Sequence, residues 1–448
     1  MGGHHAIRAL ACRTRVAGPT PRRLGDRWSH DVTVSFGEAL RVWLRLGCIS
    51  FGGPIAQIDL MHREVVERRG WIDERSFLHA LRLCTALPGP EAQQLACYLG
   101  YRLHGVRGAI ASGGLFILPS LLLIIALSWI YMAFGDTGVV TGIVRALGGA
   151  VVALVVAAGI RMGRKVVKTR WTLGIAIIAG VAMLLGGLFP ILVAVGAVAG
   201  ILIGRFRPTA LVPLEDQADP GEPPNPVDRP ALIRRAVIGA VLWLGAIGAL
   251  LLVGGVVAEL TGFFTIVALV TFGGAYAVLP FVAAAAVGRF GWLTPEQMIA
   301  GLALGETTPG PLIMVNSFVG FVAGWTTLGG AVGGIVGALV ATFATFAPSF
   351  LMISVGAPLI EHVPRRGPVA DALAALQGVV AGAIAVLVIY LADHAIFQAG
   401  GVDLLAAAIA LVVFALHRRG FPVPALIIGT AVIGAICGLI DPAFALLT

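Results

Sequence analysis

Two Pro-Gly-Pro triplets, each inside a long apolar run, are the residues of this sequence best placed to form a ligand site. They are Pro88-Gly89-Pro90 and Pro309-Gly310-Pro311. Proline removes a backbone donor and clashes with the preceding turn, and glycine adopts dihedral angles that other residues avoid, so each triplet predicts a complete helix break. In hydrocarbon such a break is tolerated only where it is buried in protein or lines a polar cavity. Two matching breaks therefore predict a binding site between two halves of a membrane protein.

A new helix is expected after each break, beginning at Glu91 and at Leu312. The start of a helix offers unpaired N–H donors and a partial positive charge, which suits an anion without a buried cation. Neutral side chains near the breaks can add donors, or can equally serve as helix caps and interhelical hydrogen bonds. These side chains are Gln93, Gln94, Thr307, Thr308 and Asn316.

Two carboxylates lie at the breaks, Glu91 directly after Pro90 and Glu306 three residues before Pro309. An ionised carboxylate in a membrane is costly, so each is a candidate proton carrier or gate residue, with capping of a broken helix end as the alternative. Arg82 and His79 precede the first break. They are candidates for attracting an anion, and snorkelling to the membrane interface explains them equally well.

Paired glycines mark a second set of expected breaks, Gly52-Gly53 and Gly273-Gly274. Close helix packing alone explains such glycines. Their fixed spacing to the two Pro-Gly-Pro triplets favours one site built from all four breaks.

An internal repeat relates the two halves of the chain. Three motif pairs lie 221 positions apart: Ser50-Phe51-Gly52-Gly53 with Thr271-Phe272-Gly273-Gly274, Gly70-Trp71-Ile72 with Gly291-Trp292-Leu293, and the two Pro-Gly-Pro triplets. Two further pairs lie 229 positions apart, Pro119-Ser120 with Pro348-Ser349 and Ala146-Leu147 with Ala375-Leu376. The ordered spacing predicts two homologous halves separated by one insertion.

The composition is that of an integral membrane protein. Of the 448 residues, 58% are hydrophobic and 12% charged, with a mean hydropathy of +0.95, whereas soluble domains carry about 25% charged residues. The net charge of +8 comes from short loops between apolar runs, which positive-inside topology explains better than nucleic-acid binding does.

Apolar runs predict an all-α fold with about thirteen transmembrane helices. Six lie before a proline-rich acidic segment, near 36–60, 76–104, 108–134, 138–160, 172–187 and 189–204. Seven follow it, near 236–257, 263–288, 295–323, 328–356, 371–395, 403–416 and 421–446. The expected organisation is a cytoplasmic basic tail (1–35), a first repeat (36–204), a polar cytoplasmic linker (205–235), a connecting helix (236–257) and a second repeat (258–448).

Loop charges orient the chain with the N-terminus in the cytoplasm and the C-terminus outside. Basic residues then fall inside (Arg161, Arg164, Lys165, Lys168, Arg170, Arg205, Arg207, Arg365, Arg366, Arg418, Arg419) and acidic ones outside (Asp136, Glu259, Asp393, Asp403). The charges of loop 62–75 balance and do not contribute. Because the connecting helix crosses once more, the second half is expected to be inverted relative to the first.

Motifs for enzyme chemistry are absent from the sequence. There is no GxxxxGK[ST], HExxH or GxSxG pattern, and the cysteines show no metal-ligand spacing. No cofactor or metal is expected, and a membrane-embedded enzyme explains neither the repeat nor the breaks. A secondary transporter explains both.

At these motifs the chain closely resembles the chromate ion transporter family, in its long two-domain form. The resemblance is carried by Phe51 to Pro54, Glu64 to Trp71, Leu87 to Gln94, Thr271 to Pro280, Gly291 to Pro295 and Gly305 to Pro311. It implies export of chromate across a bacterial inner membrane and chromate resistance, with sulfate as a close tetrahedral analogue.

An inside-negative membrane potential is sufficient to drive a dianion outward. Coupling to protons, which would make the protein an antiporter, is a further possibility. A homodimer is also possible, and the alternative function is that of a permease for sulfate or another oxyanion.

Overall fold

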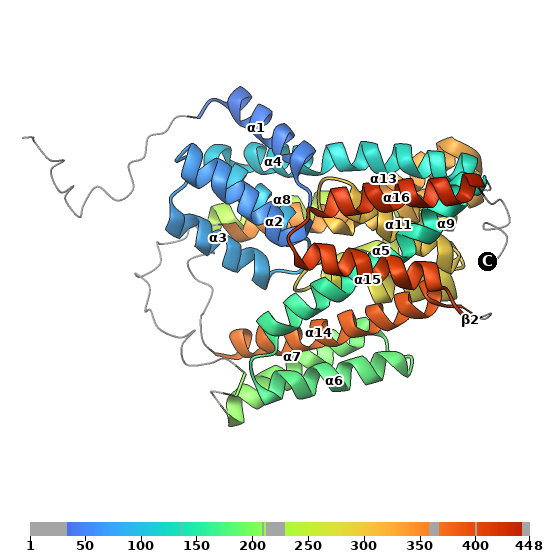
Figure 1. The fold of residues 1–448 in the computed structure, drawn as a ribbon. Coiled ribbons are helices and arrows are strands. Elements are labelled where there is room, and N and C mark those ends of the chain that lie inside the picture. Colours follow the sequence, from blue (N-terminus) through green and yellow to red (C-terminus); the bar gives the residue numbers. More distant parts are fainter. Residues whose placement is uncertain are drawn as a thin grey trace, which may run out of the picture. The chain divides into compact units, whose positions relative to one another are not determined.

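The computed structural model describes residues 34–135, 137–207, 210–211, 229–357, 367–398 and 401–440, and these residues are almost entirely helical, as the sequence predicts. The elements of the first half are α1 (Phe36–Ile49), α2 (Gly53–His62), the π-helical turn η1 (Arg63–Arg68), α3 (Glu74–Ala86), α4 (Glu91–Phe134), α5 (Gly138–Val166), α6 (Arg170–Leu184) and α7 (Phe189–Phe206) (Figure 1).

Helix α8 (Arg229–Val253) connects the halves. The second half contains α9 (Gly255–Val270), η3 (Ala275–Ala277), α10 (Leu279–Ala283), η4 (Ala284–Arg289), α11 (Pro295–Thr307), η5 (Leu312–Met314), α12 (Val315–Gly324), η6 (Trp325–Gly329), α13 (Gly330–Gly356), α14 (Pro368–Ala395), α15 (Leu404–Arg418) and α16 (Val423–Ile440). A short antiparallel pair, β1 (Phe397–Gln398) and β2 (Gly401–Val402), links α14 to α15.

The two halves repeat each other element by element. Helices α3 and α11 begin and end 221 positions apart, and so do the two π-helical turns η1 and η4. The helix pairs α6 with α15 and α7 with α16 follow with equal lengths of 15 and 18 residues, 234 positions apart. Helix α8 has no counterpart among the described elements of the first half.

Local sequence explains why α3 and α11 begin where they do. The Asp73 carboxylate accepts a hydrogen bond from the Ser76 amide, and the Thr294 hydroxyl, at the equivalent position, accepts one from the Gln297 amide. Each cap satisfies a donor that the first helical turn leaves unpaired. Pro295 then opens α11 at a position where no backbone donor is needed.

Helix α4 is interrupted in its middle. His104 and Gly105 have non-helical backbone angles, with φ 61° and ψ −149° at Gly105. Gly330 has φ 61° and ψ −159° and separates η6 from α13 in the second half. The two breaks are therefore the same structural feature, and the residues after Gly105 correspond to α13.

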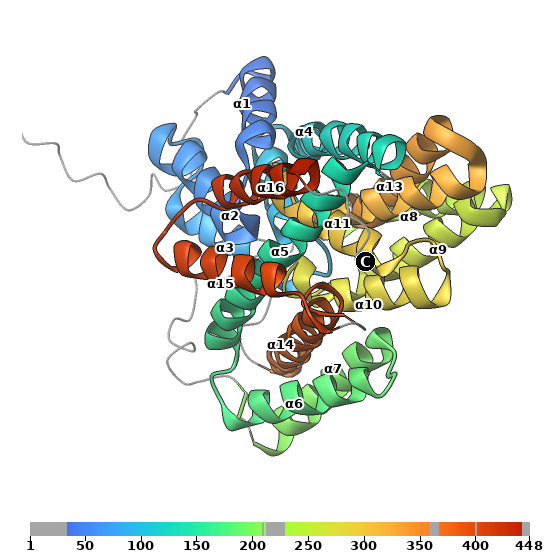
Figure 2. The same cartoon turned by 45° about the vertical axis from the view of Figure 1, so that its right-hand side comes forward.

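The end of each half packs on the other half. Helices α6 and α7 lie along α14, and α15 and α16 lie along α5, so the halves are interlaced (Figures 1 and 2). Glycines allow the closest approach, because a Cβ on Gly142 of α5 would collide with the backbone of Gly434 in α16. This is the small-residue packing common between helices in membranes.

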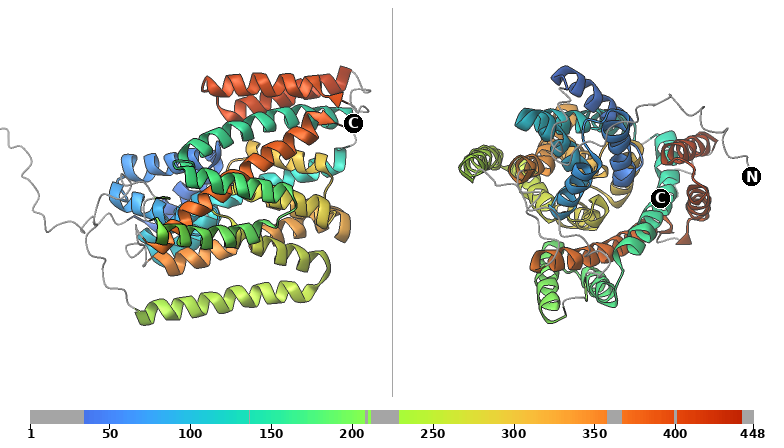
Figure 3. Two further views of the ribbon diagram at one scale, coloured as in Figure 1. Left: turned by 90° about the horizontal axis from the view of Figure 1, so that it is seen from below. Right: turned by 90° about the vertical axis from the view of Figure 1, so that its left-hand side faces the viewer.

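Within the described part of the chain, seven helices are long and apolar enough to cross a membrane, which supports a multi-pass membrane protein. They are Glu91–Phe134, Gly138–Arg164, Phe189–Phe206, Arg229–Val253, Leu312–Gly356, Pro368–Ala395 and Val423–Ile440. The remaining expected spans consist of broken or shorter helices, so the count of about thirteen stays a prediction. Helix α8 lies at the edge of the bundle (Figure 3), and only 6% of its apolar 18-residue stretch is buried inside the protein.

Several boundaries differ from those expected. Helix α8 includes Arg229 to Val253 rather than beginning near 236, and it ends before two glycines with positive φ. The expected spans 36–60 and 263–288 are each interrupted at their glycine pair. Most of tail 1–35, most of linker 205–235, Asp136, Arg365, Arg366 and residues 441–448 lie outside the described residues.

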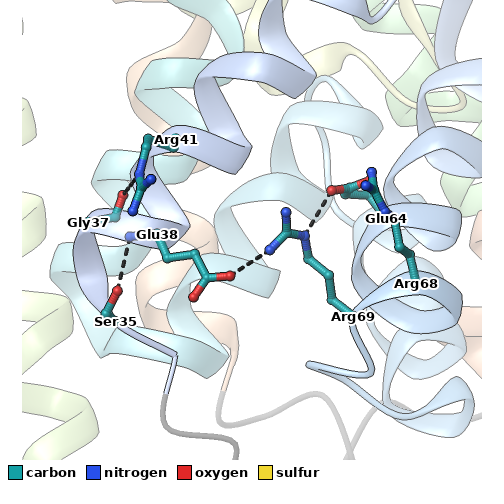
Figure 4. A network of polar contacts seen from close by, with 7 residues as sticks. All are labelled: Ser35, Gly37, Glu38, Arg41, Glu64, Arg68 and Arg69. Atoms are coloured by element: carbon teal, nitrogen blue, oxygen red, sulfur yellow. Dashed lines mark hydrogen bonds and ion pairs between the residues drawn. The ribbon is translucent and has the colours of Figure 1, made fainter.

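A network of charges links α1 to η1 in the first half (Figure 4). Arg69 donates to Glu38 at 2.6 Å and to Glu64 at 2.8 Å, and Arg68 pairs with Glu64 at 3.1 Å. Burial of Glu64 would raise its pKa, but the hydrogen bonds and charges of Arg69 and Arg68 outweigh burial and hold the pKa below its ordinary value. At the position equivalent to Glu38, Glu259 accepts instead from Trp292 at 3.3 Å.

Candidate functional site

The two Pro-Gly-Pro triplets have nearly the same backbone. The residues that cap the C-terminal ends of α3 and α11 are Leu87 and Thr308, each with φ −85° and ψ 146°. Gly89 and Gly310 follow with φ 129° and 101°, which L-residues rarely adopt. A helical turn then restarts after Pro90 and after Pro311. The predicted breaks are therefore present at both places.

Each Pro-Gly-Pro break is hydrogen-bonded to the other half of the chain. The Gly89 amide donates to the carbonyl of Thr271 at 2.7 Å, and the Gly310 amide donates to the carbonyl of Ser50 at 2.8 Å. Ser50 and Thr271 are themselves equivalent in the repeat. The two bonds are thus reciprocal, and they join the two halves through backbone atoms alone.

The glycine pairs Gly52-Gly53 and Gly273-Gly274 immediately follow these two carbonyls, and all four glycines have φ between 68° and 100°. The chain turns sharply there, so the preceding carbonyl becomes available to the opposite half. The structure thus brings together the two kinds of break that the fixed spacing had suggested belong together. Gly52 is exposed, Gly53 and Gly273 are half-buried and Gly274 is buried.

A serine from the opposite half also packs on each Pro-Gly-Pro glycine. A Cβ on Gly89 would lie 2.5 Å from the Ser349 hydroxyl oxygen, and one on Gly310 would lie 2.8 Å from the Ser120 Cβ. Ser120 and Ser349 follow the equivalent prolines within α4 and α13. Glycine is therefore required at both triplets for conformation and for space.

Gln57 is a site residue that the sequence reasoning missed. Its side chain is buried, and its Nε2 donates to the Gly310 carbonyl at 2.6 Å and to the Ser50 carbonyl at 3.2 Å. It therefore holds the Gly310 break against the Ser50 turn. The equivalent position in the second half is Val278, so this contact is made on one side only. The sequence feature that could have indicated Gln57 is an amide side chain within an apolar run, four residues after a glycine pair.

The buried amides near the breaks use their nitrogens in internal hydrogen bonds. Gln94 donates to the Pro88 carbonyl at 2.7 Å, Gln93 to the Cys97 sulfur at 3.1 Å, and Asn316 to the Thr345 hydroxyl at 3.1 Å. Several oxygens close to the breaks have no hydrogen-bond partner among the described residues: those of the Gln57, Gln93, Gln94 and Asn316 amides and of the Ser120 hydroxyl. Buried polar atoms left unpaired are costly and are usually satisfied by water or ligand.

Thr307 and Thr308 hydrogen-bond within their own helix, the alternative to ligand binding that the sequence left open. Their hydroxyls donate to carbonyls of their own helix, Thr307 to Ala303 at 2.5 Å and Thr308 to Gly305 at 3.4 Å. A hydroxyl has one proton, so either side chain must rotate before it can donate to an anion.

Glu306 lies at the end of α11 with only 8% of its surface exposed. It accepts a hydrogen bond from the Tyr276 hydroxyl at 2.6 Å, and the Arg161 guanidinium is within electrostatic range. Tyr276 was not predicted as a site residue. A buried carboxyl with one phenolic partner and a more distant cation can hold a proton or a negative charge, so both readings of Glu306 stay open.

Glu91 and Arg82 have different surroundings. Glu91 begins α4 and is half-buried, as suits an acidic side chain at a helix start. Arg82 is exposed on α3 and points away from the packed face that includes Leu83, whereas His79 is half-buried. The structure therefore does not bring Arg82 to the buried break. Within the part of the chain that the structure describes, no three His, Cys, Asp or Glu side chains form a metal site.

Comparison with known proteins gives one family. The model of the family described as chromate transporter matches residues 37–202 and 258–435, which are the two repeats. A chromate transport protein of Pseudomonas aeruginosa is 32% identical over 362 residues, covering 79% of this chain and 80% of the relative.

Two further relatives match over comparable lengths. A chromate transport protein of Cupriavidus metallidurans is 29% identical over 412 residues, covering 90% of this chain and 94% of the relative. A probable chromate transport protein of Synechococcus elongatus is 29% identical over 362 residues, covering 79% and 84%. No solved structure matches the chain.

Proposed function

This chain belongs to the chromate transporter family, and from that premise we propose that it exports chromate from the cytoplasm through a site formed by its four helix breaks. The family assignment agrees with the resemblance seen in the motifs. The curated relatives are transport proteins rather than enzymes.

The observation that carries the proposal is the reciprocal pair of hydrogen bonds from Gly89 to Thr271 and from Gly310 to Ser50. Transporters built from two repeats bind their substrates where discontinuous helices of both halves meet. Behind these bonds, the helical segments that start at Glu91 and Leu312 present backbone N–H groups and the positive ends of their dipoles. A tetrahedral dianion would be held there by neutral donors, without a buried cation that would hinder release.

The halves are proposed to lie in opposite orientations across the membrane. The C-terminal ends of α5 and α7 carry Arg161, Arg164 and Arg205 and are assigned to the cytoplasm. The acidic residues Glu259, Asp393 and Asp403 are assigned to the outside. The unpaired helix α8 supplies the additional crossing. The N-terminus is then cytoplasmic and the C-terminus external.

The membrane potential is proposed as the driving force. Moving a dianion out of an inside-negative cell gains about 2.3 kcal/mol per charge, or roughly 4.6 kcal/mol at ~100 mV. Since a tenfold ratio corresponds to ~1.4 kcal/mol, this gain supports a gradient of more than about a thousandfold. Proton coupling through Glu306 is not required for export on this account.

Everted membrane vesicles provide the test of the function. Vesicles that contain the protein are expected to accumulate chromate when a positive-inside potential is imposed, and control vesicles without it are not. Sulfate in excess measures selectivity, because it has the same shape and charge. Equal chromate content in both kinds of vesicle would overturn the export proposal.

A further inference from the structure

A cavity of about 550 Å³ lies between the ends of α5 and α15, one helix from each half. Its polar lining consists of Arg161 and Arg164 from α5 and of His417 and Arg418 from α15, and we call it the basic vestibule. The volume lies within the ~300–1,000 Å³ typical of small-molecule pockets. The cavity is therefore large enough for a hydrated inorganic ion.

The positive charge of the basic vestibule is not neutralised by the protein. Among the described residues, Arg161, Arg164 and Arg418 form no ion pair. Some arginines elsewhere are paired, as Arg145 is with Asp403 at 2.6 Å. Three like charges around one cavity repel each other, and an anion in the cavity relieves that repulsion.

The basic vestibule adjoins the interior site. Arg161 is near enough to Glu306 and Tyr276 for its charge to act on both, and Glu306 lies three residues before the second Pro-Gly-Pro triplet. The next residue of α5, Met162, reaches within 3.7 Å of where a Cβ on Gly273 would lie. Arg161 thus connects the vestibule to the breaks of the second half.

The repeat does not reproduce the basic vestibule at its second position. In the equivalent place α14 carries Tyr390 and Asp393 instead of Arg161 and Arg164. Helix α6 ends there with Met183 and Leu184 instead of His417 and Arg418. The Asp393 side chain is 69% exposed. The positions equivalent to the basic vestibule are therefore aromatic, apolar or acidic rather than cationic.

We propose that the basic vestibule is a capture site for tetrahedral oxyanions, from which the anion passes by Arg161 to the helix breaks. The proposal rests on the proposed function and orientation, which place Arg161 and Arg418 on the cytoplasmic side. Cationic clefts raise the local anion concentration and the rate of association. Asp393, at the position equivalent to Arg164, adds negative charge on the outer side and disfavours rebinding of an anion there, so the unequal charge of the two sides favours export at low internal concentration.

The decisive variants remove the three vestibule arginines together, as Arg161→Gln, Arg164→Gln and Arg418→Gln. The matched control is Arg170→Gln, Arg205→Gln and Arg419→Gln, which removes the same charge from the same face outside the cavity. In everted vesicles the vestibule variant is expected to raise KM for chromate roughly tenfold at unchanged kcat, and the control is expected to match the wild type. Raising the ionic strength should increase the wild-type KM more than that of the vestibule variant.

An unchanged KM in the vestibule variant, with active wild type, overturns the capture site and leaves the proposed function intact. If the wild-type protein does not transport chromate, the proposed function itself is overturned instead. Anion binding is then measured separately, as the change in melting temperature that chromate or sulfate produces in the full-length protein in phosphatidylcholine nanodiscs. A shift lost only in the vestibule variant supports the site. A shift produced by cardiolipin and by neither soluble anion assigns the cavity to lipid headgroups and overturns the proposal.

Discussion

Gly310 combines two requirements that no other residue type meets. Its φ of 101° excludes a side chain on conformational grounds, and Ser120 of the opposite half occupies the space where a Cβ would lie. The same two constraints hold at Gly89 with Ser349. At the residue scale the breaks are thus junctions between halves rather than simple helix ends.

Replacing Gly310 with alanine tests this junction. The change should cost about 1–2 kcal/mol for the positive φ and about 1–3 kcal/mol for overpacking, and should abolish chromate transport. Gly114→Ala in α4 is the control, because nothing lies within 4 Å of its added Cβ. Ser120→Gly in the Gly310→Ala background removes the steric part and should restore some activity. Wild-type transport by Gly310→Ala would refute the assigned role of the break.

Glu306→Gln tests whether the buried carboxyl carries protons. Glutamine can still accept the Tyr276 hydrogen bond, so the variant is expected to fold and to transport chromate. If Glu306 carries protons, the transport rate of the variant no longer depends on pH. Tyr276→Phe removes the hydrogen bond but keeps the carboxyl, and should retain pH dependence. A Glu306→Gln variant with the wild-type pH profile would reduce Glu306 to a cap on α11.

At the element scale, the interlaced packing makes each half depend on the other. Helix α16 rests on α5 through glycines, and α7 rests on α14 in the equivalent place. Because the last two helices of each half are packed mainly on the opposite half, separating the halves would expose the faces that hold them.

A valine at Gly434 should break this contact. The added side chain would meet the Gly142 backbone, so we expect a loss of at least about 1–3 kcal/mol, seen as a lower melting temperature in detergent. Gly429→Val lies on the same helix, at an exposed position with nothing within 4 Å, and controls for β-branched helix propensity. If the two variants had the same melting temperature, the contact between Gly434 and Gly142 would not be what holds α16 in place.

The elements of the fold were more predictable from the sequence than the partners they pack against. Proline and glycine chemistry located all four breaks of the site, and the constant offset alone is enough to pair α3 with α11. Gln57 was missed because its partner Gly310 lies 253 positions away, and an isolated amide in an apolar run does not indicate what it bonds. Thr307 was expected to donate to a ligand, yet a helical threonine can bond its own backbone, and sequence alone does not decide between the two.

At the scale of the whole molecule, the proposed inversion places equivalent surfaces of the two halves on opposite sides of the membrane. The charged network of Glu38, Glu64 and Arg69 lies in the first half, and Glu259 with Trp292 takes the equivalent place in the second.

Single cysteines at Glu67 and Gly288 test the inversion. Both positions are exposed and lie in equivalent turns, η1 and η4. In a background without the five native cysteines, an impermeant reagent added to intact cells should label only one of the two variants, and the other should be labelled only after permeabilisation. Labelling of both from the same side would establish parallel repeats instead.

The most direct test of the account is the voltage dependence of chromate accumulation by the purified protein in proteoliposomes. A dianion carried alone through the paired breaks predicts a steady-state gradient that changes about tenfold for every ~30 mV of imposed potential, with no gradient for Gly310→Ala. A wild-type gradient that did not respond to potential, or full accumulation by Gly310→Ala, would contradict the account.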